Sequence, residues 1–382
     1  MIIQGGTIHI GDGTVIEDGY IRLVGGKIIE VAPGRYARPE ELLDARGMII
    51  TPGFIDAHCH LGMWEEGLAF EGDDGNEITD PCTPQLRAID AVNPMDRAFA
   101  EALDYGITTV VTGPGSANPI AGQICAMKTG GRVADEMVIA APVGMKFALG
   151  ENPKSCYNEK SQTPSTRMAI AALIRGELQK AKRYLEDRRK ADEDEDTDPP
   201  ELDVKCEALV PVLEGKLKAH FHAHRADDIC TALRIIREFS LDGVIVHGTE
   251  GHLIADTIAA AGVPVICGPI ISTRGKPELK NLDRANAARL LDAGVTVAIN
   301  TDAPEVPIDL LATETAITVS AGVPAERAVA LITGNPAKIC GIDHRVGRIA
   351  PGLDGDILIF DRDPIGLLVK PVHIFLDGNK LR

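Results

Sequence analysis

The sequence predicts an α/β protein: a (β/α)₈ TIM barrel that carries a small β-sandwich domain built from both chain termini. Two observations support this fold class. Short β-like segments separated by glycines occupy both ends of the chain, whereas the middle alternates apolar strands with amphipathic helices. We expect residues 1–51 and 342–382 to form the small domain and residues 52–341 the barrel. A barrel usually needs roughly 250 residues, so the middle has room for a helical, acidic insertion at about 161–212.

The two chain ends predict one shared β-domain. Glycine-rich turns, such as Gly11-Asp12-Gly13 and Gly25-Gly26, favour tight hairpins between short strands. The C-terminal end repeats this style, and chain termini often lie close together in a domain. The expected strands cover residues 1–4, 7–10, 20–24, 27–31, 355–360 and 372–376.

The middle of the chain predicts repeated βα units. A helix that opens at Asn93-Pro94 and closes at Gly106 matches the N-cap, first-turn proline and C-terminal glycine preferences. Another helix carries Ile229, Leu233, Ile236 and Phe239 on one face. Strands are expected at residues 107–112, 138–142, 144–148, 217–222, 244–247, 263–267 and 295–300.

The insertion predicts one long helix from Ser165 to about Arg189, followed by an acidic run up to Pro200. We expect this run to be a solvated loop rather than a metal site, because flexible carboxylates hold no fixed geometry.

Composition and charge narrow the range of functions. The formal net charge of −17 argues against nucleic-acid binding through general phosphate attraction. No apolar run reaches the length of a membrane span, and the N-terminus lacks the pattern of a secretory signal. The eight cysteines are scattered without a Cys-x-x-Cys motif, as expected for reduced thiols. We therefore expect a cytoplasmic protein that acts on a small molecule, without a nucleic-acid or membrane partner.

A short apolar strand at residues 54–57 ends in His58-Cys59-His60. Residues i and i+2 of a strand point to the same side, so both imidazoles can face one metal ion while Cys59 faces away. The pair alone is weak support, because an isolated His-x-His is more often an ordinary packing feature.

Three other strand ends carry residues of the same ligand type: His222, His247 and Asp302. The interval from His222 to His247 is 25 residues, about one βα unit, and the interval to Asp302 is about two units. Each residue therefore falls at the C-terminal mouth of its strand, where barrel enzymes place their catalytic groups. Four strand ends in the same phase predict a metal centre.

Several motifs resemble the amidohydrolase superfamily, and more narrowly its imidazolonepropionase and prolidase-like branch. The resemblance covers essentially the whole chain and implies a metal-dependent hydrolase of an amide, lactam, dipeptide or N-acyl amino acid C–N bond. The motifs are Pro52-Gly53-Phe54-Ile55-Asp56-Ala57-His58-Cys59-His60, Tyr105-Gly106-Ile107-Thr108-Thr109-Val110, Asn300-Thr301-Asp302, Gly334-Asn335-Pro336-Ala337-Lys338 and residues 347–356.

The resemblance implies that His58, His60 and Asp302 bind one divalent ion and that His222 and His247 bind a second ion if one is present. His224 stays an alternative to His222, or a substrate contact. Zinc is the favoured metal, with manganese, iron or cobalt as alternatives.

Two further residues receive roles from the resemblance. Lys146 is the candidate for a bridging carbamate, with a contact to a substrate carboxylate as its alternative. Asp302 is the expected catalytic residue, taking a proton from the attacking water and delivering it to the departing nitrogen.

Two other functions stay open. Deaminase branches carry a glutamate three residues after the histidine of the fifth strand, where this chain has Arg225. Arg225 could bind a substrate carboxylate or be a surface charge at a helix start. A non-catalytic binding protein is the second alternative, although such homologues usually lose ligands that this chain retains. A homo-oligomer is expected only from family habit.

Two loops are expected around the predicted mouth of the barrel. The segment from Gly113 to Pro119 is too rich in glycine and proline for regular structure and is expected to form an active-site loop. A long loop from Gly62 to Asp80, which contains Trp64, could cover the site.

Overall fold

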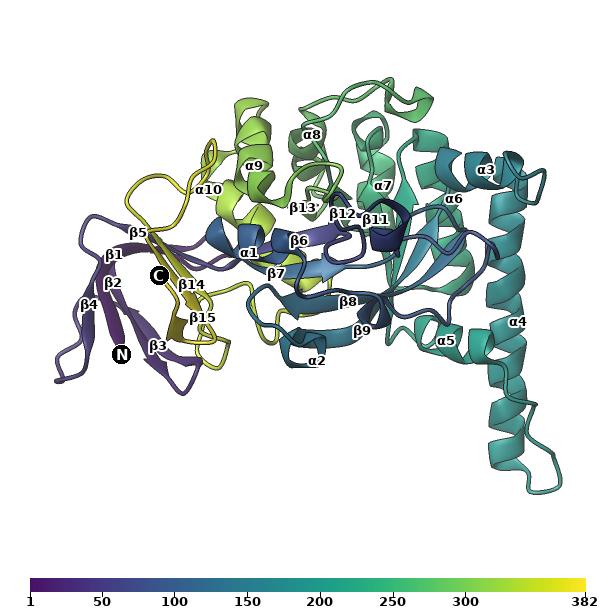
Figure 1. Cartoon of the computed structure of the whole chain (residues 1–382), viewed down its shortest axis with the longest axis horizontal. Helices are drawn as coiled ribbons and strands as arrows, with labels where there is room; N and C mark the ends of the chain where they lie inside the picture. The colour runs from purple at the N-terminus through teal and green to yellow at the C-terminus, as the bar shows by residue number, and fades with distance from the viewer.

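The computed structural model describes residues 1–382 and contains two separate eight-stranded sheets (Figure 1). The first sheet comes from both chain ends, as predicted, because β14 pairs antiparallel with β5. Its strands are β1 (Ile2–His9), β2 (Val15–Val24), β3 (Lys27–Pro33), β4 (Leu42–Asp44), β5 (Ile49–Pro52), β14 (Ile357–Phe360), β15 (His373–Leu376) and β16 (Asn379–Lys380). All eight are hydrogen-bonded into one sheet, where two packed sheets of a sandwich were expected.

The second sheet curls into a nearly closed barrel in which the strands follow one another in chain order. Its strands are β6 (Phe54–Cys59), β7 (Ile107–Thr112), β8 (Ile120–Lys128), β9 (Val138–Ala148), β10 (Lys218–Ala223), β11 (Gly243–His247), β12 (Val265–Cys267) and β13 (Val297–Ile299). The two strands expected at residues 138–142 and 144–148 form the single strand β9.

One barrel strand corrects the expectation of eight parallel βα units. β8 runs antiparallel to both β7 and β9. The segment between Thr112 and Ile120 is too short for the helical crossover that a parallel neighbour requires, which takes a dozen or more residues. The chain therefore turns back at once and forms a hairpin.

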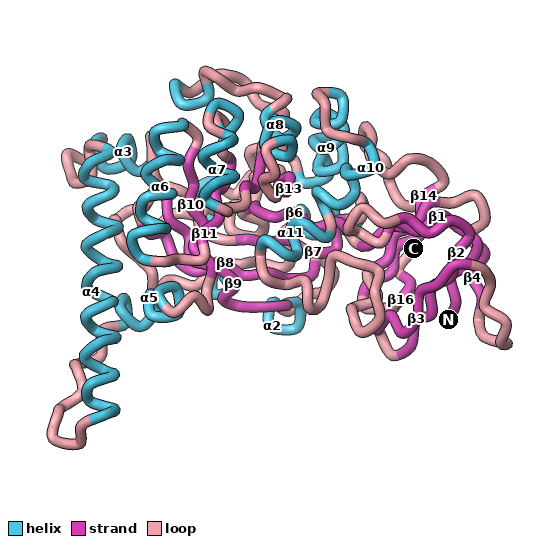
Figure 2. Tube along the Cα trace, turned by 180° about the vertical axis from the view of Figure 1, so that it is seen from behind, coloured by secondary structure: helices cyan, strands magenta, loops and turns pink.

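Helices cover the outside of the barrel (Figure 2). They are α1 (Arg97–Asp104), α2 (Ala134–Met137), α3 (Glu151–Asn158), α4 (Arg167–Glu193), α5 (Val204–Leu213), α6 (Ala226–Phe239), α7 (Ala255–Ala261), α8 (Asn286–Asp292), α9 (Leu311–Ser320), α10 (Ala325–Ala328) and α11 (Gly334–Ile339). None of these helices combines the length and apolar character needed to cross a bilayer.

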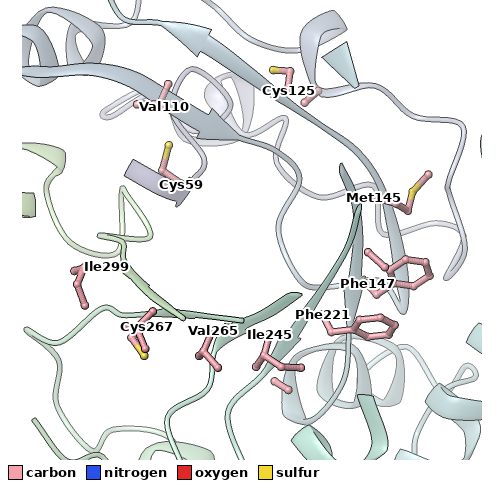
Figure 3. Packing of buried hydrophobic residues seen from close by; sticks show 14 of the residues in the cluster. Cys59, Val110, Cys125, Met145, Phe147, Phe221, Ile245, Val265, Cys267 and Ile299 are labelled. Carbon is pink, nitrogen blue, oxygen red and sulfur yellow. The ribbon is translucent and has the colours of Figure 1, made fainter. Parts of the chain in front are cut away.

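The barrel strands separate two apolar cores. Outward-facing side chains such as Phe147, Phe221 and Ile245 belong to the large core shared with the helices, and Figure 3 shows them around the ring of strands. The interior core contains Val244 and Val246 and is completed by residues 337–346. Since these residues pack against one end of the interior, polar side chains are left to the other end.

Helix α4 is the longest helix and extends well beyond the barrel in both views (Figures 1 and 2). Thr166 caps its start by accepting a hydrogen bond from the Ala169 amide at 3.1 Å. Only its first half is buried, through Ile170, Ile174, Leu178 and Ala181. The acidic run predicted as a solvated loop begins within α4, because residues 191–193 still belong to the helix, and its remainder forms the connection to α5.

Candidate metal centre

Strand β6 delivers His58 and His60 to the open end of the barrel. Cys59 between them packs into the outer core, away from the two histidines as expected, although the register of β6 is irregular between Asp56 and Cys59. His58 Nε2 lies 3.4 Å and His60 Nε2 3.3 Å from Asp302 Oδ1. Three polar groups from opposite edges of the barrel sheet thus meet at one point.

A second cluster comes from the neighbouring strands β10 and β11. His222, His224 and His247 each offer a ring nitrogen, and these nitrogens lie within 4.8 Å of one another. His247 also forms such a group with His58 and Asp302, so it connects the two clusters. The structure therefore brings His224 as close to His247 as it brings His222, with both ring centroids 4.6 Å from the ring of His247.

The backbone conformation of His247, and not the alternation of side chains along its strand, directs its ring into the site. Val244 and Val246 face the barrel interior, so strict alternation would point His247 outwards. Its φ of 72° breaks the alternation and brings the ring to the mouth. Asp302 also has a positive φ, of 58°. Such left-handed backbone is uncommon for residues with a side chain and clusters at functional sites.

Hydrogen bonds to the outer ring nitrogen orient two of these histidines. His60 Nδ1 donates to the carbonyl of Gly113 and His247 Nδ1 to the carbonyl of Gly268, both at 2.7 Å. A carbonyl can only accept, so each Nε2 keeps its lone pair for another partner. His224 Nδ1 lies 2.7 Å from the hydroxyl oxygen of Thr249.

Several buried polar atoms around the mouth have no hydrogen-bond partner in the protein: both ring nitrogens of His222, Nδ1 of His58 and Oδ1 of Asp302. Leaving such groups unpaired costs about 1–3 kcal/mol each. Imidazole nitrogens and a carboxylate oxygen are the ligands that zinc and similar divalent ions take. The donor set therefore fits a divalent metal.

Lys146 on β9 joins the same group of side chains. Its Nζ lies 2.9 Å from His58 Nε2, and the residue is 1% exposed. Burial lowers the pKa of Lys146 to about 8. β9 pairs with β10 so that Lys146 lies opposite His220, two residue pairs before His222.

Burial controls the charge of the site. It lowers the pKa of His58, His222 and His224 well below the usual value and that of His247 in the same direction, which favours the neutral form that binds metal. Burial alone would raise the pKa of Asp302, but His247, His58 and His60 hold this pKa well below its usual range. Asp302 is therefore the anionic group of the site.

A cavity of about 1040 Å³ opens over these residues. His60, Lys146, His222, His224, His247 and Asp302 all line it. Its walls come from the two loops expected at the mouth, through Trp64 and Ser116, and from a loop after β12 that includes Lys276. Arg225 does not line the cavity: its guanidinium pairs with Asp227 at 2.8 and 2.9 Å at the start of α6.

Some contacts of the site had no signal in the sequence. Gly268 and Thr249 hold histidine rings through a backbone carbonyl and a hydroxyl group, which no motif marks. Glu278 is 1% exposed, and its Oε1 lies 3.7 Å from His224 Nε2. It follows an irregular loop, where strand spacing gives no prediction.

A nearly closed barrel with polar groups at its mouth and a second sheet from both termini defines the class of the protein. The chain belongs to the amidohydrolase family, whose family model matches residues 49–380. Within this superfamily it falls in the imidazolonepropionase and prolidase-like branch, as predicted.

Individual relatives agree with this assignment. A crystal structure of an amidohydrolase from Thermotoga maritima MSB8 is 37% identical, with a TM-score of 0.95 over 100% of this chain and 99% of that chain. The amidohydrolase tasK of Hapsidospora irregularis is 28% identical over 89% of this chain. The matched region is only 37% of the length of tasK. The imidazolonepropionase of Geobacillus kaustophilus is 24% identical over 94% of this chain and 84% of its own length.

Proposed function

We propose that this protein is a metal-dependent amidohydrolase that cleaves a C–N bond of a small molecule, such as an amide, a lactam, a dipeptide or an N-acyl amino acid. The observation that carries the proposal is the convergence of two ligand groups on His247, with buried nitrogen and oxygen atoms that have no partner in the protein. Membership of the amidohydrolase family supports hydrolysis as the chemistry.

His58, His60 and Asp302 would hold one ion, and His222 and His247 a second, with His224 as the alternative to His222. Lys146, whose amine contacts His58, would contribute a further anionic ligand as a carbamate. A bound divalent ion supplies Lewis acidity that lowers the pKa of water from 15.7 towards about 7 and polarises the scissile carbonyl. Zinc is our first choice, and manganese, iron and cobalt suit the same donors.

Residues of the protein then transfer the proton from the attacking water to the departing nitrogen. Asp302 accepts the proton of the attacking water, whose oxygen bonds to the carbonyl carbon. His58 and His60 flank the carboxylate and keep it oriented. When the C–N bond breaks, Asp302 returns the proton to the departing nitrogen.

The test compares chelator-treated protein with protein reloaded with zinc, manganese, iron or cobalt, on dipeptides, N-acyl amino acids, lactams and simple amides. We expect metal-dependent formation of an amine and a carboxylate, which stay in one molecule when the substrate is a lactam. Asp302→Asn should lower kcat by about 10²–10⁴-fold, whereas Asp292→Asn on the exposed end of α8 should not change it.

Three results would contradict the proposal. Protein that binds none of these metals, or metal-loaded protein that hydrolyses no member of the panel, would favour a binding protein. Ammonia release from heterocyclic amines in place of amide hydrolysis would favour the deaminase alternative. The cytoplasmic location and a homo-oligomeric state stay predictions from the sequence.

A further inference from the structure

A second cavity, of about 360 Å³, lies beside the candidate metal centre. It shares His60, Trp64, Glu65, Glu66 and Pro304 with the main cavity, so the two cavities are adjacent and have part of their wall in common. We call it the side cavity. Its volume is within the range of about 300–1,000 Å³ that is usual for small-molecule sites.

The side cavity differs from the main cavity in chemistry. Of its 15 lining residues seven are hydrophobic, against four of 29 in the main cavity, and its charged residues are Glu65, Glu66, Asp96, Arg97 and Glu101. Buried Leu61, Ala303 and Ile308 contribute apolar surface, each at most 3% exposed. Leu68 and Met95, which also line it, are 48% and 67% exposed. Large apolar side chains left open next to a buried apolar surface mark a place where an apolar group can bind.

The position of the side cavity relative to Asp302 indicates which part of a substrate it would receive. Ala303 and Pro304, which directly follow Asp302, line it. The amide of His60 donates to the carbonyl of Ala303 at 2.8 Å, which fixes this segment against the end of β6. Asp302 lines only the main cavity, as do His222, His224 and His247. The side cavity begins at the next residue, Ala303, and shares His60 with the main cavity, so a substituent on the nitrogen that Asp302 protonates can extend past His60 into the side cavity.

We infer that the side cavity binds an aliphatic or aromatic group on the amine half of the substrate. The inference rests on the proposed function, in which Asp302 protonates the departing nitrogen. The reaction is R–CO–NH–R′ + H₂O → R–COOH + R′–NH₂: the water oxygen bonds to the carbonyl carbon, the C–N bond breaks, and the nitrogen leaves with one further hydrogen. R′ occupies the side cavity and the acyl group R the polar main cavity.

Trp64 belongs to the wall that both cavities share and is the only tryptophan of the chain. Its ring meets the ring of His60 edge-on, with 4.5 Å between centroids. Glycines make room for it, since a Cβ on Gly75 would lie 2.3 Å and one on Gly115 2.6 Å from the indole. A ligand in the side cavity touches this wall, so the fluorescence of the protein reports its binding.

The experiment titrates metal-loaded protein with methylamine, propylamine, isobutylamine, isoamylamine and benzylamine, which represent the amine product. Binding is followed by Trp64 fluorescence and by calorimetry. Each buried methylene should tighten the Kd about fourfold. Isoamylamine should therefore bind more than tenfold more tightly than methylamine.

The double variant Leu68→Gln/Met95→Gln tests the location. Both side chains are substantially exposed, so the fold should persist. We expect the dependence of the Kd on the length of the alkyl chain to fall to less than half of its wild-type size. The matched control is Met168→Gln/Leu253→Gln, which changes two apolar residues that are 80% and 55% exposed outside both cavities. This control should keep the wild-type dependence.

Equal affinity for all five amines, or a dependence that persists unchanged in the Leu68/Met95 variant, would overturn the inference. Failure of the proposed function gives a different pattern. A normal dependence on chain length without any metal-dependent hydrolysis would retain the side cavity as an apolar site and reject the amidohydrolase activity.

Discussion

At the scale of single residues, the site depends on backbone conformations as much as on side-chain identity. His247 and Asp302 both adopt positive φ, a strain of roughly 1–3 kcal/mol each. Contacts with neighbours hold them in place: His247 donates to the carbonyl of Gly268 at 2.7 Å, and the amide of Asp302 donates to the carbonyl of His58 at 3.3 Å. A change that weakens these contacts should therefore disturb the site without touching a ligand.

Gly268 gives the first prediction at this scale. Its φ is 142°, and a Cβ at this position would lie 2.2 Å from the carbonyl oxygen of Asn300. Gly268→Ala should lower the free energy of unfolding by about 1–3 kcal/mol and reduce the metal content, because it displaces the carbonyl that orients His247. Gly275→Ala, in the loop that follows, is the control. Urea unfolding and metal analysis measure the two effects, and a fully loaded, stable Gly268→Ala protein would contradict this account.

Lys146 gives the second prediction. If it carries a bridging carbamate, Lys146→Ala should lose one of two metal ions and about 100-fold in activity, because the second ion loses its anionic ligand. A short carboxylic acid such as acetate should restore part of the activity by taking the place of the carbamate. Protein grown with ¹³C-bicarbonate should show a carbamate signal in ¹³C NMR. One metal ion in the wild type and no carbamate signal would show that Lys146 acts as a free amine.

At the scale of elements, much of the arrangement could be predicted from strand spacing. The segments ending at His58, His222 and His247 are strands of one sheet, and their ends meet at the same mouth. β8 was not predicted, because Ile120–Lys128 is largely buried on both faces and shows no alternation, and because a hairpin is not part of a βα repeat. Arg225 lies three residues after His222, where a substrate contact was one expectation. Its guanidinium instead pairs with Asp227, which keeps it at the start of α6.

Helix α9 supports the loop after β12 through Glu314. This buried carboxylate accepts the amide hydrogen of Ile271 at 2.9 Å and that of Ile270. Burial raises the pKa of Glu314 to about 7 from a usual value near 4.5. The folded protein therefore binds this proton more tightly than the unfolded chain, and the contribution of Glu314 to stability falls as the pH rises from about 4.5 to about 7.

Glu314→Gln should remove this pH dependence. The difference in unfolding free energy between wild type and variant should change by about 1–3 kcal/mol between pH 5 and pH 8, with the wild type losing stability at the higher pH. Urea unfolding at both pH values measures it. Glu326→Gln, at an exposed position of α10, serves as the control. A difference that is the same at both pH values would show that Glu314 is already ionised in the acidic range.

At the scale of the whole molecule, a buried ion-pair cluster connects the two sheets. Lys128 on β8 of the barrel lies 2.5 Å from Asp356, 3.1 Å from Asp354 and 3.0 Å from Asp377. Asp356 and Asp377 flank strands of the other sheet, so one lysine joins segments from both parts of the chain.

Lys128→Met should lower the free energy of unfolding by about 3–5 kcal/mol, because it leaves buried carboxylates without their cation. Lys27→Met removes a lysine that also pairs with Asp354, but this side chain is 45% exposed, so its loss should cost within about 1 kcal/mol. Chemical denaturation followed by circular dichroism compares the two variants. Equal losses of unfolding free energy in the two variants would show that the different exposure of Lys128 and Lys27 does not decide how much each ion pair stabilises the fold.

The gap between β6 and β13 has a further consequence for the barrel as a whole. These strands share no ladder of backbone pairs; side chains and a few loop amides join them, chiefly Asp56, which accepts from the hydroxyl and amide of Thr301 at 2.6 and 3.1 Å. His58 and His60 lie on one side of this seam and Asp302 on the other. An ion held by all three would act as a cross-link that fastens the seam. Amide hydrogen exchange along β6 and β13 should then slow on metal binding, whereas exchange in the terminal sheet should not change.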